Sequence, residues 1–202
     1  MGGRESPGAR RFTVEPLDLP QMREIYLSRM VEDFPENELK PLALIESGMR
    51  RGFYRCWGAA DGSGTLAYAC FVCVERDARA LCLFDYLAVR RDVRGEGVGS
   101  AFLQALSGAQ LRAFDAVLLE VDDPSAVPPG AERGIRERRL RFYLRNGLVE
   151  TGVTARVFGA EFRLLALPGR TPPDADAVRG DYAALYRAML PARLFRREIL
   201  IR

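Results

Sequence analysis

Apolar and polar positions along the first half of the chain follow two different periods. Apolar residues recur at helical spacing between residues 19 and 33 and again at 42–49, so both segments are predicted helices. Alternating or contiguous apolar runs predict strands, which lie at residues 12–14, 53–59, 65–74 and 80–89. The turn sequence Asp61-Gly62-Ser63-Gly64 joins the second and third of these strands as a hairpin.

The second half continues this alternation of strands and helices. A glycine-rich turn after residue 89 leads into an amphipathic helix that ends near Ala113. The contiguous apolar run at 116–121 predicts a buried strand, parallel to the strand before the helix. The remaining predicted elements are a loop at 122–131, a charged helix at 132–146 capped by Gly147, a hairpin of strands 149–157 and 161–166, a helix at 180–190 and an apolar terminus at 195–201.

This order of elements predicts a mixed α/β domain followed by a short helical tail. The domain spans residues 1–168, and residues 169–202 form a C-terminal helical extension. A segment of that length is too short to enclose its own core, so the extension is expected to pack on the same domain or on a partner chain. Both a monomer and a homodimer are compatible with it.

Composition and charge are those of a globular protein. The chain has 202 residues, of which 48% are hydrophobic and 28% charged, and its net charge is only +3. A nucleic-acid interface needs a concentrated basic stripe, and the segment from Arg133 to Arg145 is the one candidate. Because Glu132 and Glu137 interrupt the basic character of the helix at 132–146, nucleic acid is not an expected partner.

The cysteines and the hydrophobic runs bear on metal binding, membrane association and location. The chain has four cysteines, in apolar strand-like stretches typical of core positions, and no histidine, so no metal site is expected. The sequence has neither a membrane-spanning apolar run nor an apolar secretory signal at its start, so we expect no membrane association and a cytoplasmic location.

The glycine-rich turn is the feature with the clearest chemical meaning. It reads Arg94-Gly95-Glu96-Gly97-Val98-Gly99-Ser100, between a predicted strand and a predicted helix. A pyrophosphate needs several backbone N–H groups directed at one place, and a helix N-terminus with glycines supplies them. The spacing is neither that of a dinucleotide-binding turn nor that of a nucleoside-triphosphate loop. Taken alone, the turn is also compatible with a purely structural strand-to-helix connection.

Two segments together resemble a known family. Asp85-Tyr86-Leu87-Ala88-Val89 followed by the glycine-rich turn resembles the acetyl-CoA signature of the GNAT N-acetyltransferase superfamily, Arg/Gln-x-x-Gly-x-Gly/Ala. The later segment from Arg141 to Leu148 is similar to the superfamily's Phe-Tyr-x-x-x-Gly-Phe pattern, with leucine in place of the last phenylalanine. The resemblance implies a GNAT-like fold with a central, mostly antiparallel, twisted sheet that contains a splayed parallel strand pair and is flanked by helices.

The resemblance also implies a co-substrate and its contacts. Acetyl-CoA would be the acyl donor, its pantetheine arm bonded by the main chain of Leu87, Ala88 and Val89. The residues implied for the pyrophosphate are Arg94, Gly95, Glu96, Gly97, Val98, Gly99 and Ser100. Tyr143 would lie near the thiol, where a phenol can protonate the leaving sulfur as general acid. The alternative for Tyr143 is a core aromatic residue of its helix.

The sequence gives less information on the general base and on the acceptor site. With no histidine available, Glu120 is the preferred base and Asp85 the alternative, because a carboxylate buried in an apolar strand becomes a stronger base. Tyr26, Phe34 and Glu36 are candidates for lining the acceptor site, although the two aromatic residues also suit the core. The expected acceptor is an amine of a small molecule or peptide whose identity stays open.

Two other functions remain compatible with these patterns. The first is a non-catalytic module that binds acyl-CoA as a sensor or scaffold. The second is a nucleic-acid-binding protein that uses the arginine-rich helix at 132–145, which would show strongly salt-dependent binding.

Overall fold

The computed structural model describes residues 10–36, 38–168 and 174–202. The predictions for the first nine residues and for the break at 169–173 lie outside this part of the chain. The chain divides into two compact units, Met1–Cys70 with Tyr86–Leu106 and Phe71–Asp85 with Ser107–Arg202, so β3 and β4 contribute to both.

The strands form a sheet in the hydrogen-bonding order β1-β2-β3-β4-β5-β7-β6-β8. The pair β4–β5 is parallel, whereas β1–β2, β5–β7, β6–β7 and β6–β8 are antiparallel. This topology confirms the predicted mixed α/β fold with a mostly antiparallel sheet and one parallel pair.

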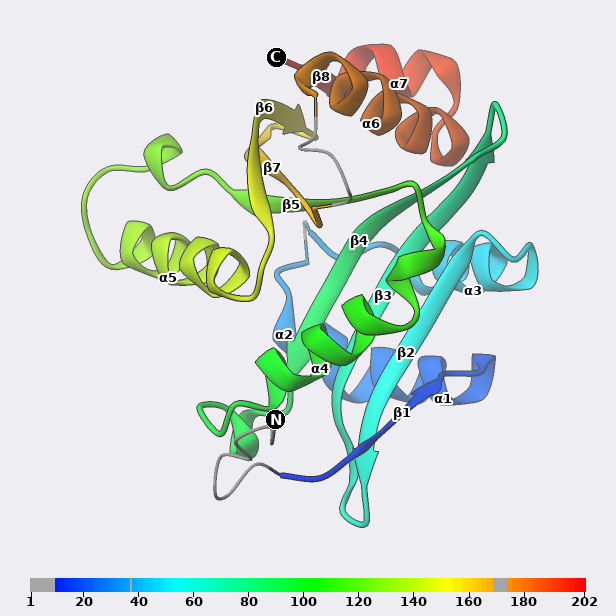
Figure 1. Cartoon of the computed structure of the whole chain (residues 1–202), viewed down its shortest axis with the longest axis vertical. Helices are drawn as coiled ribbons and strands as arrows, with labels where there is room; N and C mark the ends of the chain where they lie inside the picture. Colours follow the sequence, from blue (N-terminus) through cyan, green and yellow to red (C-terminus); the bar gives the residue numbers. More distant parts are fainter. Residues whose placement is uncertain (1–9, 37, 169–173) are drawn as a thin grey trace, which may run out of the picture. The chain divides into compact units, whose positions relative to one another are not determined.

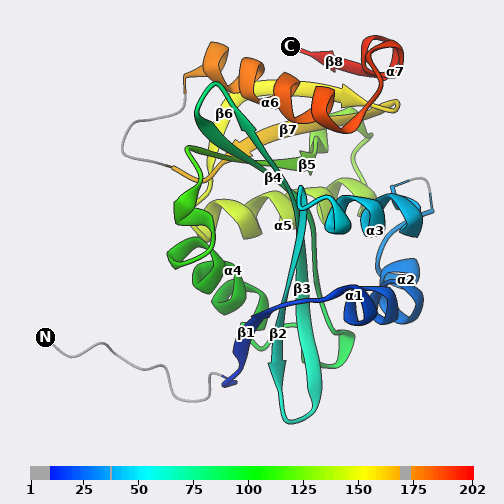
Figure 2. The same cartoon turned by 90° about the vertical axis from the view of Figure 1, so that its right-hand side faces the viewer.

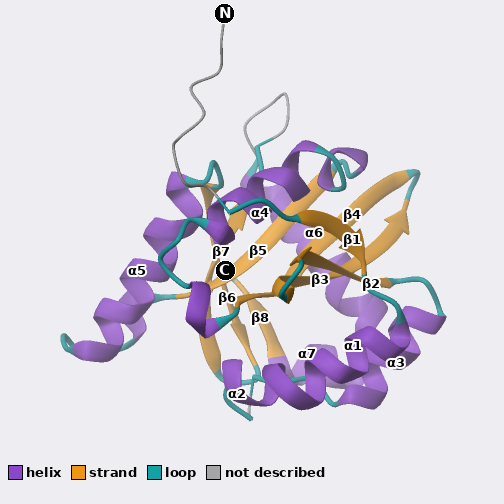
Figure 3. Cartoon of the chain, turned by 90° about the horizontal axis from the view of Figure 1, so that it is seen from below, coloured by secondary structure: helices purple, strands orange, loops and turns teal. Residues whose placement is uncertain are grey.

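In the first unit, helices cover both faces of the strands. Its elements are β1 (Thr13–Pro16), α1 (Leu19–Ile25), the π-helical turn η1 (Tyr26–Met30), α2 (Val31–Asp33), α3 (Leu42–Arg50), β2 (Tyr54–Asp61), parts of β3 (Gly64–Arg76) and β4 (Arg79–Val89), η2 (Arg91–Val93) and α4 (Val98–Gly108). Helices α1 and α3 lie on one side of β2 and β3, and α4 lies on the other (Figures 1 and 3).

The first helical segment differs from the single helix predicted at 19–33. A capping box starts it, in which Asp18 accepts from the Gln21 backbone N–H and the Gln21 side chain accepts from the Asp18 N–H, both at 2.9 Å. A π-helical turn then separates α1 from α2. Within this turn the Ser28 hydroxyl donates to the Glu24 carbonyl at 2.7 Å, a bond that competes with the regular ladder and bends helices. Side-chain periodicity carries no sign of such an insertion.

The second unit contains the rest of the sheet and the C-terminal elements. Besides its parts of β3 and β4, these are η3 (Leu111–Ala113), β5 (Ala116–Asp122), η4 (Pro124–Ala126), α5 (Ala131–Arg145), β6 (Val149–Val157), β7 (Ala160–Ala166), α6 (Ala175–Met189), α7 (Ala192–Glu198) and β8 (Ile199–Ile201). Helix α6 packs on β6 and β5, and β8 pairs with β6 (Figure 2).

The parallel pair separates within this unit. Its register runs from Leu81 opposite Ala116 to Phe84 opposite Leu119, and both strands continue beyond the last of these pairs. Asp85 and Glu120 are therefore the first residues after the ladder, one on each strand. Beyond this point β5 keeps its antiparallel pairing with β7, as far as Asp122 opposite Phe162.

The C-terminal elements are longer and more regular than the sequence predicts. Helix α6 begins at Ala175, because the Asp174 side chain accepts from the Ala177 N–H at 2.9 Å and caps it. The prediction started this helix at Gly180, which in fact lies within it. The apolar terminus predicted at 195–201 divides into the end of α7 and the strand β8.

All four cysteines are buried thiols outside any disulfide, which confirms their prediction as core residues. Across the described ranges, no group of three or more histidine, cysteine, aspartate or glutamate side chains is arranged to hold a metal ion. None of the described helices combines the length and apolar character needed to span a membrane.

Candidate functional site

The glycine-rich turn exposes backbone at the start of α4. Gly95 and Gly97 have φ of 89° and 83°, a left-handed conformation that residues with a side chain rarely adopt. A Cβ added to either glycine would meet no atom within 4 Å, so open space lies in front of the turn. The Ala101 N–H bonds the Gly97 carbonyl at 3.0 Å, which leaves the N–H groups before it without acceptors inside the helix. This geometry fits a pyrophosphate.

Arg94 is held against the chain at the start of this turn. Its Nε donates to the Val89 carbonyl at 2.8 Å, and its Nη2 pairs with Asp33 Oδ1 at 2.8 Å. Asp33 is buried, whereas half of the Arg94 side chain is exposed. The guanidinium therefore joins the end of β4, the end of α2 and the turn, and its positive charge lies beside the predicted pyrophosphate position. Val89, predicted to bond the pantetheine arm, already accepts one hydrogen bond through its carbonyl.

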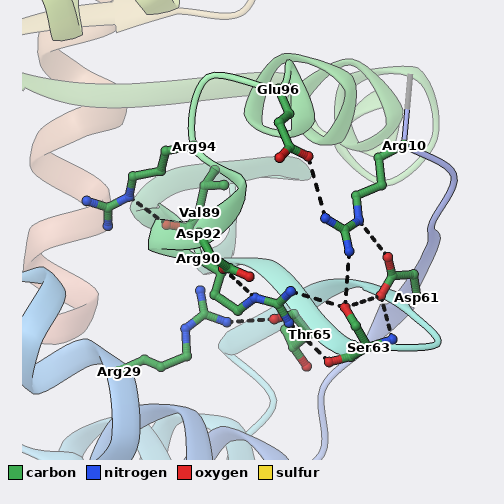
Figure 4. A network of polar contacts seen from close by, with 10 residues as sticks. All are labelled: Arg10, Arg29, Asp61, Ser63, Thr65, Val89, Arg90, Asp92, Arg94 and Glu96. Carbon is green, nitrogen blue, oxygen red and sulfur yellow. Dashed lines mark hydrogen bonds and ion pairs between the residues drawn. The ribbon is translucent and has the colours of Figure 1, made fainter. Parts of the chain in front are cut away.

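A polar network borders the turn on another side (Figure 4). Its members, described residues of the first unit, are Arg10, Asp61, Ser63, Arg90, Asp92 and Glu96. Hydrogen bonds from Ser63 and from Arg10 hold the pKa of Asp61 well below its usual range. Glu96, the one acidic residue of the turn, lies 3.5 Å from Arg10 Nη1. This pairing offsets the negative charge that would otherwise oppose an anion at the turn.

Arg29 adds a further guanidinium to this unit, from the π-helical turn. Its Nη1 donates to the Thr65 carbonyl at 2.9 Å, and its guanidinium carbon lies 4.9 Å from the centre of the Tyr68 ring. Burial, reinforced by the like charges of Arg90 and Arg94, lowers the pKa of Arg29. The sequence analysis missed Arg29, because nothing in the helical pattern distinguishes it from a solvent-facing arginine.

Two of the three predicted acceptor residues, Tyr26 and Phe34, are linked through Lys40 and Tyr86 in the first unit. The Tyr26 hydroxyl donates to the Lys40 carbonyl at 3.0 Å, and Phe34 packs edge-to-face on Tyr86 with ring centres 4.8 Å apart. The Lys40 N–H donates to the Tyr86 hydroxyl at 2.9 Å, and the Lys40 ammonium lies 5.4 Å from the centre of that ring. Glu36 is exposed. Tyr26 and Phe34 thus support the segment around Lys40, the first through a hydrogen bond and the second by packing.

In the second unit, Tyr143 is a buried residue of α5, 8% exposed. Burial raises the pKa of Tyr143 to about 12, with Asp122 adding to the effect and Arg139 opposing it. Arg139, one turn earlier on α5, forms an ion pair with Asp122 at the end of β5. The phenol is therefore protonated near neutral pH and has a proton to donate.

Glu120 is bound by two tyrosines of the C-terminal extension. The hydroxyls of Tyr182 and Tyr186 both donate to its Oε1, each at 2.6 Å. The sequence analysis missed both tyrosines. Their spacing of four residues in a helix, which places two phenols on one face, was the available signal.

Tyr143 and Glu120 belong to the second unit, whereas residues 87–89 and 94–100 belong to the first. Within the second unit, three arginines of α5 are engaged locally: Arg133 with the Val127 carbonyl, Arg136 with Glu132 and Arg139 with Asp122.

Comparison with known proteins links this geometry to one family. The model of the acetyltransferase (GNAT) domain matches residues 52–150, a segment that contains the glycine-rich turn, Glu120 and Tyr143. No curated protein sequence matches the chain.

Solved structures of low sequence identity share the fold. A structure from Bacteroides thetaiotaomicron assigned to the GNAT acetyltransferase family has a TM-score of 0.60 and 18% identity, over 88% of this chain and 95% of that one. The ribosomal-protein-S18-alanine N-acetyltransferase from Escherichia coli has a TM-score of 0.54 and 18% identity, over 78% and 94% of the two chains. A chain of the NatC complex bound to Gag peptide and CoA has a TM-score of 0.56 and 16% identity, over 79% and 99%.

Proposed function

Because residues 52–150 place this chain in the GNAT acetyltransferase family, we propose that it transfers an acetyl group from acetyl-CoA to an amine. The observation that carries the proposal is the glycine-rich turn, where two left-handed glycines border open space and the first N–H groups of α4 have no acceptor inside the helix. The N-terminal end of the helix dipole adds a favourable field for an anion there. The donor would bring an activated thioester, and the chain's residues would hold it and move the protons.

The proposed donor contacts follow the family signature. The backbone of residues 94–100 binds the pyrophosphate, and the main chain of residues 87–89 binds the pantetheine arm. Arg94 supports this site by tying the turn to Val89 and Asp33, and its charge lies beside the bound anion. Arg10 also supports this site, because its pairing with Glu96 offsets the negative charge of the turn.

Two side chains of the second unit are proposed for proton transfer. Tyr143 acts as general acid toward the leaving thiolate, and its pKa of about 12 keeps the phenol protonated at neutral pH. Glu120 accepts the proton of the attacking ammonium group, and the tyrosine hydroxyls on its Oε1 give it a fixed orientation. The amine can then attack the acetyl carbonyl as a neutral nucleophile.

The acceptor is proposed to be a primary amine of a small molecule or peptide. One structural relative is named for acetylating the alanine of a ribosomal protein, and another holds a peptide together with CoA. These relatives share only the fold with this chain, so the choice between a peptide and a small amine belongs to experiment.

The deciding experiment supplies the purified chain with acetyl-CoA and a panel of an alanine-terminated peptide, spermidine and small aromatic amines. Thiol release that depends on the amine, with an acetylated product seen by mass spectrometry, is the expected result. CoA binding by calorimetry without transfer to any amine favours the acyl-CoA sensor instead. Absence of CoA binding rejects both functions.

The role of Glu120 has its own test in the pH profile of kcat/KM. Glu120→Gln should lower kcat/KM by about 100-fold and remove the acidic limb, because the limb reports protonation of the base. A near-normal rate with an unchanged acidic limb would reject this role.

A further inference from the structure

The contact between α6 and the end of the parallel strand pair is the strongest feature outside the family signature. Glu120 lies just after the last β4–β5 pair, and the hydroxyls of Tyr182 and Tyr186 meet at its Oε1. The two tyrosines are 0% and 4% exposed, and their ring centres are 5.0 Å apart. Both belong to the C-terminal extension, beyond the segment that matches the family.

Both phenols act as donors in this arrangement. Burial, with a further contribution from Glu120, raises the pKa values of Tyr182 and Tyr186 well above 10. Both hydroxyls therefore keep their protons at neutral pH. Both O–H groups donate to the same carboxylate oxygen, so this oxygen must act as an acceptor. Hydrogen bonds to a charged acceptor are stronger than those to a neutral one, so the arrangement favours the ionised carboxylate.

Two neighbours of Glu120 favour its neutral form. Its partner on β7 is the apolar Leu164, and from β4 the carboxylate of Asp85 acts on Tyr186 and so lies in the same cluster. Glu120 is half-buried, and partial burial and a neighbouring negative charge both favour the neutral form of a carboxyl group. The hydrogen bonds from the two tyrosines oppose this effect.

Helix α6 is itself fixed to the sheet of this unit. Asp181, next to Tyr182, is buried and forms an ion pair with Arg79 at the start of β4, with an N–O distance of 2.5 Å. The Asp174 cap fixes the start of the helix. The phenols therefore project from a rigid element, as precise positioning of a catalytic group requires.

We infer that the C-terminal helix completes the acyl-transfer site: Tyr182 and Tyr186 are positioning residues that orient Glu120 and keep it ionised near neutral pH. An ionised Glu120 attracts the acceptor as an ammonium ion and then takes one proton from its nitrogen, leaving the nitrogen lone pair for attack. The inference rests on the proposed function, and it assigns cationic primary amines as the substrate class.

A direct test follows the protonation of Glu120 without any turnover. In protein labelled with ¹³C at the glutamate carboxyl carbons, the Glu120 resonance is assigned by its loss in Glu120→Gln. Tyr182→Phe and Tyr186→Phe, which keep the packed rings, should each move the titration midpoint of Glu120 upward by about one pH unit. Tyr68→Phe is the matched control, because it removes another buried phenol that bonds a carboxylate, Asp33, 3.0 Å away. It should leave the Glu120 midpoint unchanged.

A kinetic test separates positioning from mere folding. With an amine that supports turnover, both phenylalanine variants should move the acidic limb of kcat/KM to higher pH and lower kcat/KM about tenfold at pH 6.5. The dissociation constant of CoA should stay within a factor of two. A purely structural role would lower thermal stability and leave the limb in place.

The two assays distinguish the possible failures. If the titration midpoint of Glu120 is the same in both phenylalanine variants as in the parent chain, the positioning role is wrong, whether or not the protein acetylates amines. If the titration midpoint of Glu120 shifts as expected but the chain binds CoA and acetylates no amine, the proposed function is wrong. The catalytic part of the inference is then wrong as well.

Discussion

Arg94 donates from its Nε to the carbonyl oxygen of Val89 at 2.8 Å, so the glycine-rich turn is tied to the end of the strand that it follows. One side chain thereby connects the two backbone segments proposed to hold the donor, residues 87–89 and 94–100. Removing the guanidinium should loosen the turn and also remove a positive charge near the pyrophosphate.

Arg94→Gln should therefore raise the dissociation constant of CoA about tenfold, the equivalent of one lost charge-assisted hydrogen bond. Isothermal titration calorimetry measures this directly. Arg91→Gln is the control, because Arg91 also pairs with an acidic residue of α2, Glu32, but at 3.5 Å and with both side chains 62% exposed. Equal affinities for the two variants would show that Arg94 does not support the donor site.

The left-handed glycines should be the least replaceable residues of the turn. Alanine at Gly95 or Gly97 is forced into a conformation that costs about 1 kcal/mol, although space for a methyl group exists. We expect either variant to bind CoA at least tenfold more weakly and to unfold at a slightly lower temperature. Gly108→Ala, at the end of the same helix and also without neighbours within 4 Å, should bind CoA normally.

Tyr143→Phe tests the general acid. The variant should lower kcat 10- to 100-fold with little change in the acceptor KM, because a proton donor acts in the transition state. A smaller loss than threefold would leave Tyr143 as a packing residue.

The same tyrosine should affect stability at alkaline pH. Its pKa rises from about 10 in the unfolded chain to about 12 in the fold, so its stabilising effect is complete below pH 10 and is lost as pH rises toward 12. Tyr143→Phe should therefore make the free energy of unfolding fall less steeply over this interval than in the parent chain. Denaturant unfolding at pH 9, 10 and 11 measures the two slopes.

The ion pair between Arg139 and Asp122 should matter for stability because one partner is buried. The Asp122 side chain is 11% exposed, and Arg139→Gln leaves its charge without that partner. Since Arg139 itself is half exposed, we expect a loss of about 1–2 kcal/mol. Arg141→Gln removes an exposed pair with Glu137 on the same helix and should cost less than about 0.5 kcal/mol. Urea unfolding of both variants provides the comparison.

The sequence predicted the sheet and the glycine-rich connection from strand to helix because both depend on local patterns. Contiguous apolar residues before and after this turn indicate the parallel pair β4–β5, and Gly95 and Gly97 mark its two left-handed positions. The β3–β4 turn shows the limit of this reasoning. Asp77 and Ala78 both have positive φ, at 51° and 60°, and no glycine indicates it.

Contacts between distant segments could not be predicted from the sequence. The hydrogen bonds from Tyr182 and Tyr186 to Glu120 depend on where α6 packs. That position follows from the whole arrangement of the second unit and not from any local pattern. The partners of Arg94 and Glu96 are likewise set by tertiary structure: Asp33 lies 61 residues and Arg10 86 residues away along the chain. Residue types indicated which groups carry charge, and only the fold shows which charges are neutralised.

Lys40, half-buried beside the Tyr86 ring, carries the only lysine side-chain amine in the sequence. Any acetyl group transferred to the protein's own lysine side chains must therefore appear at one position. A single tryptic peptide reports this background, so self-modification can be separated from acceptor turnover by mass spectrometry without changing a residue.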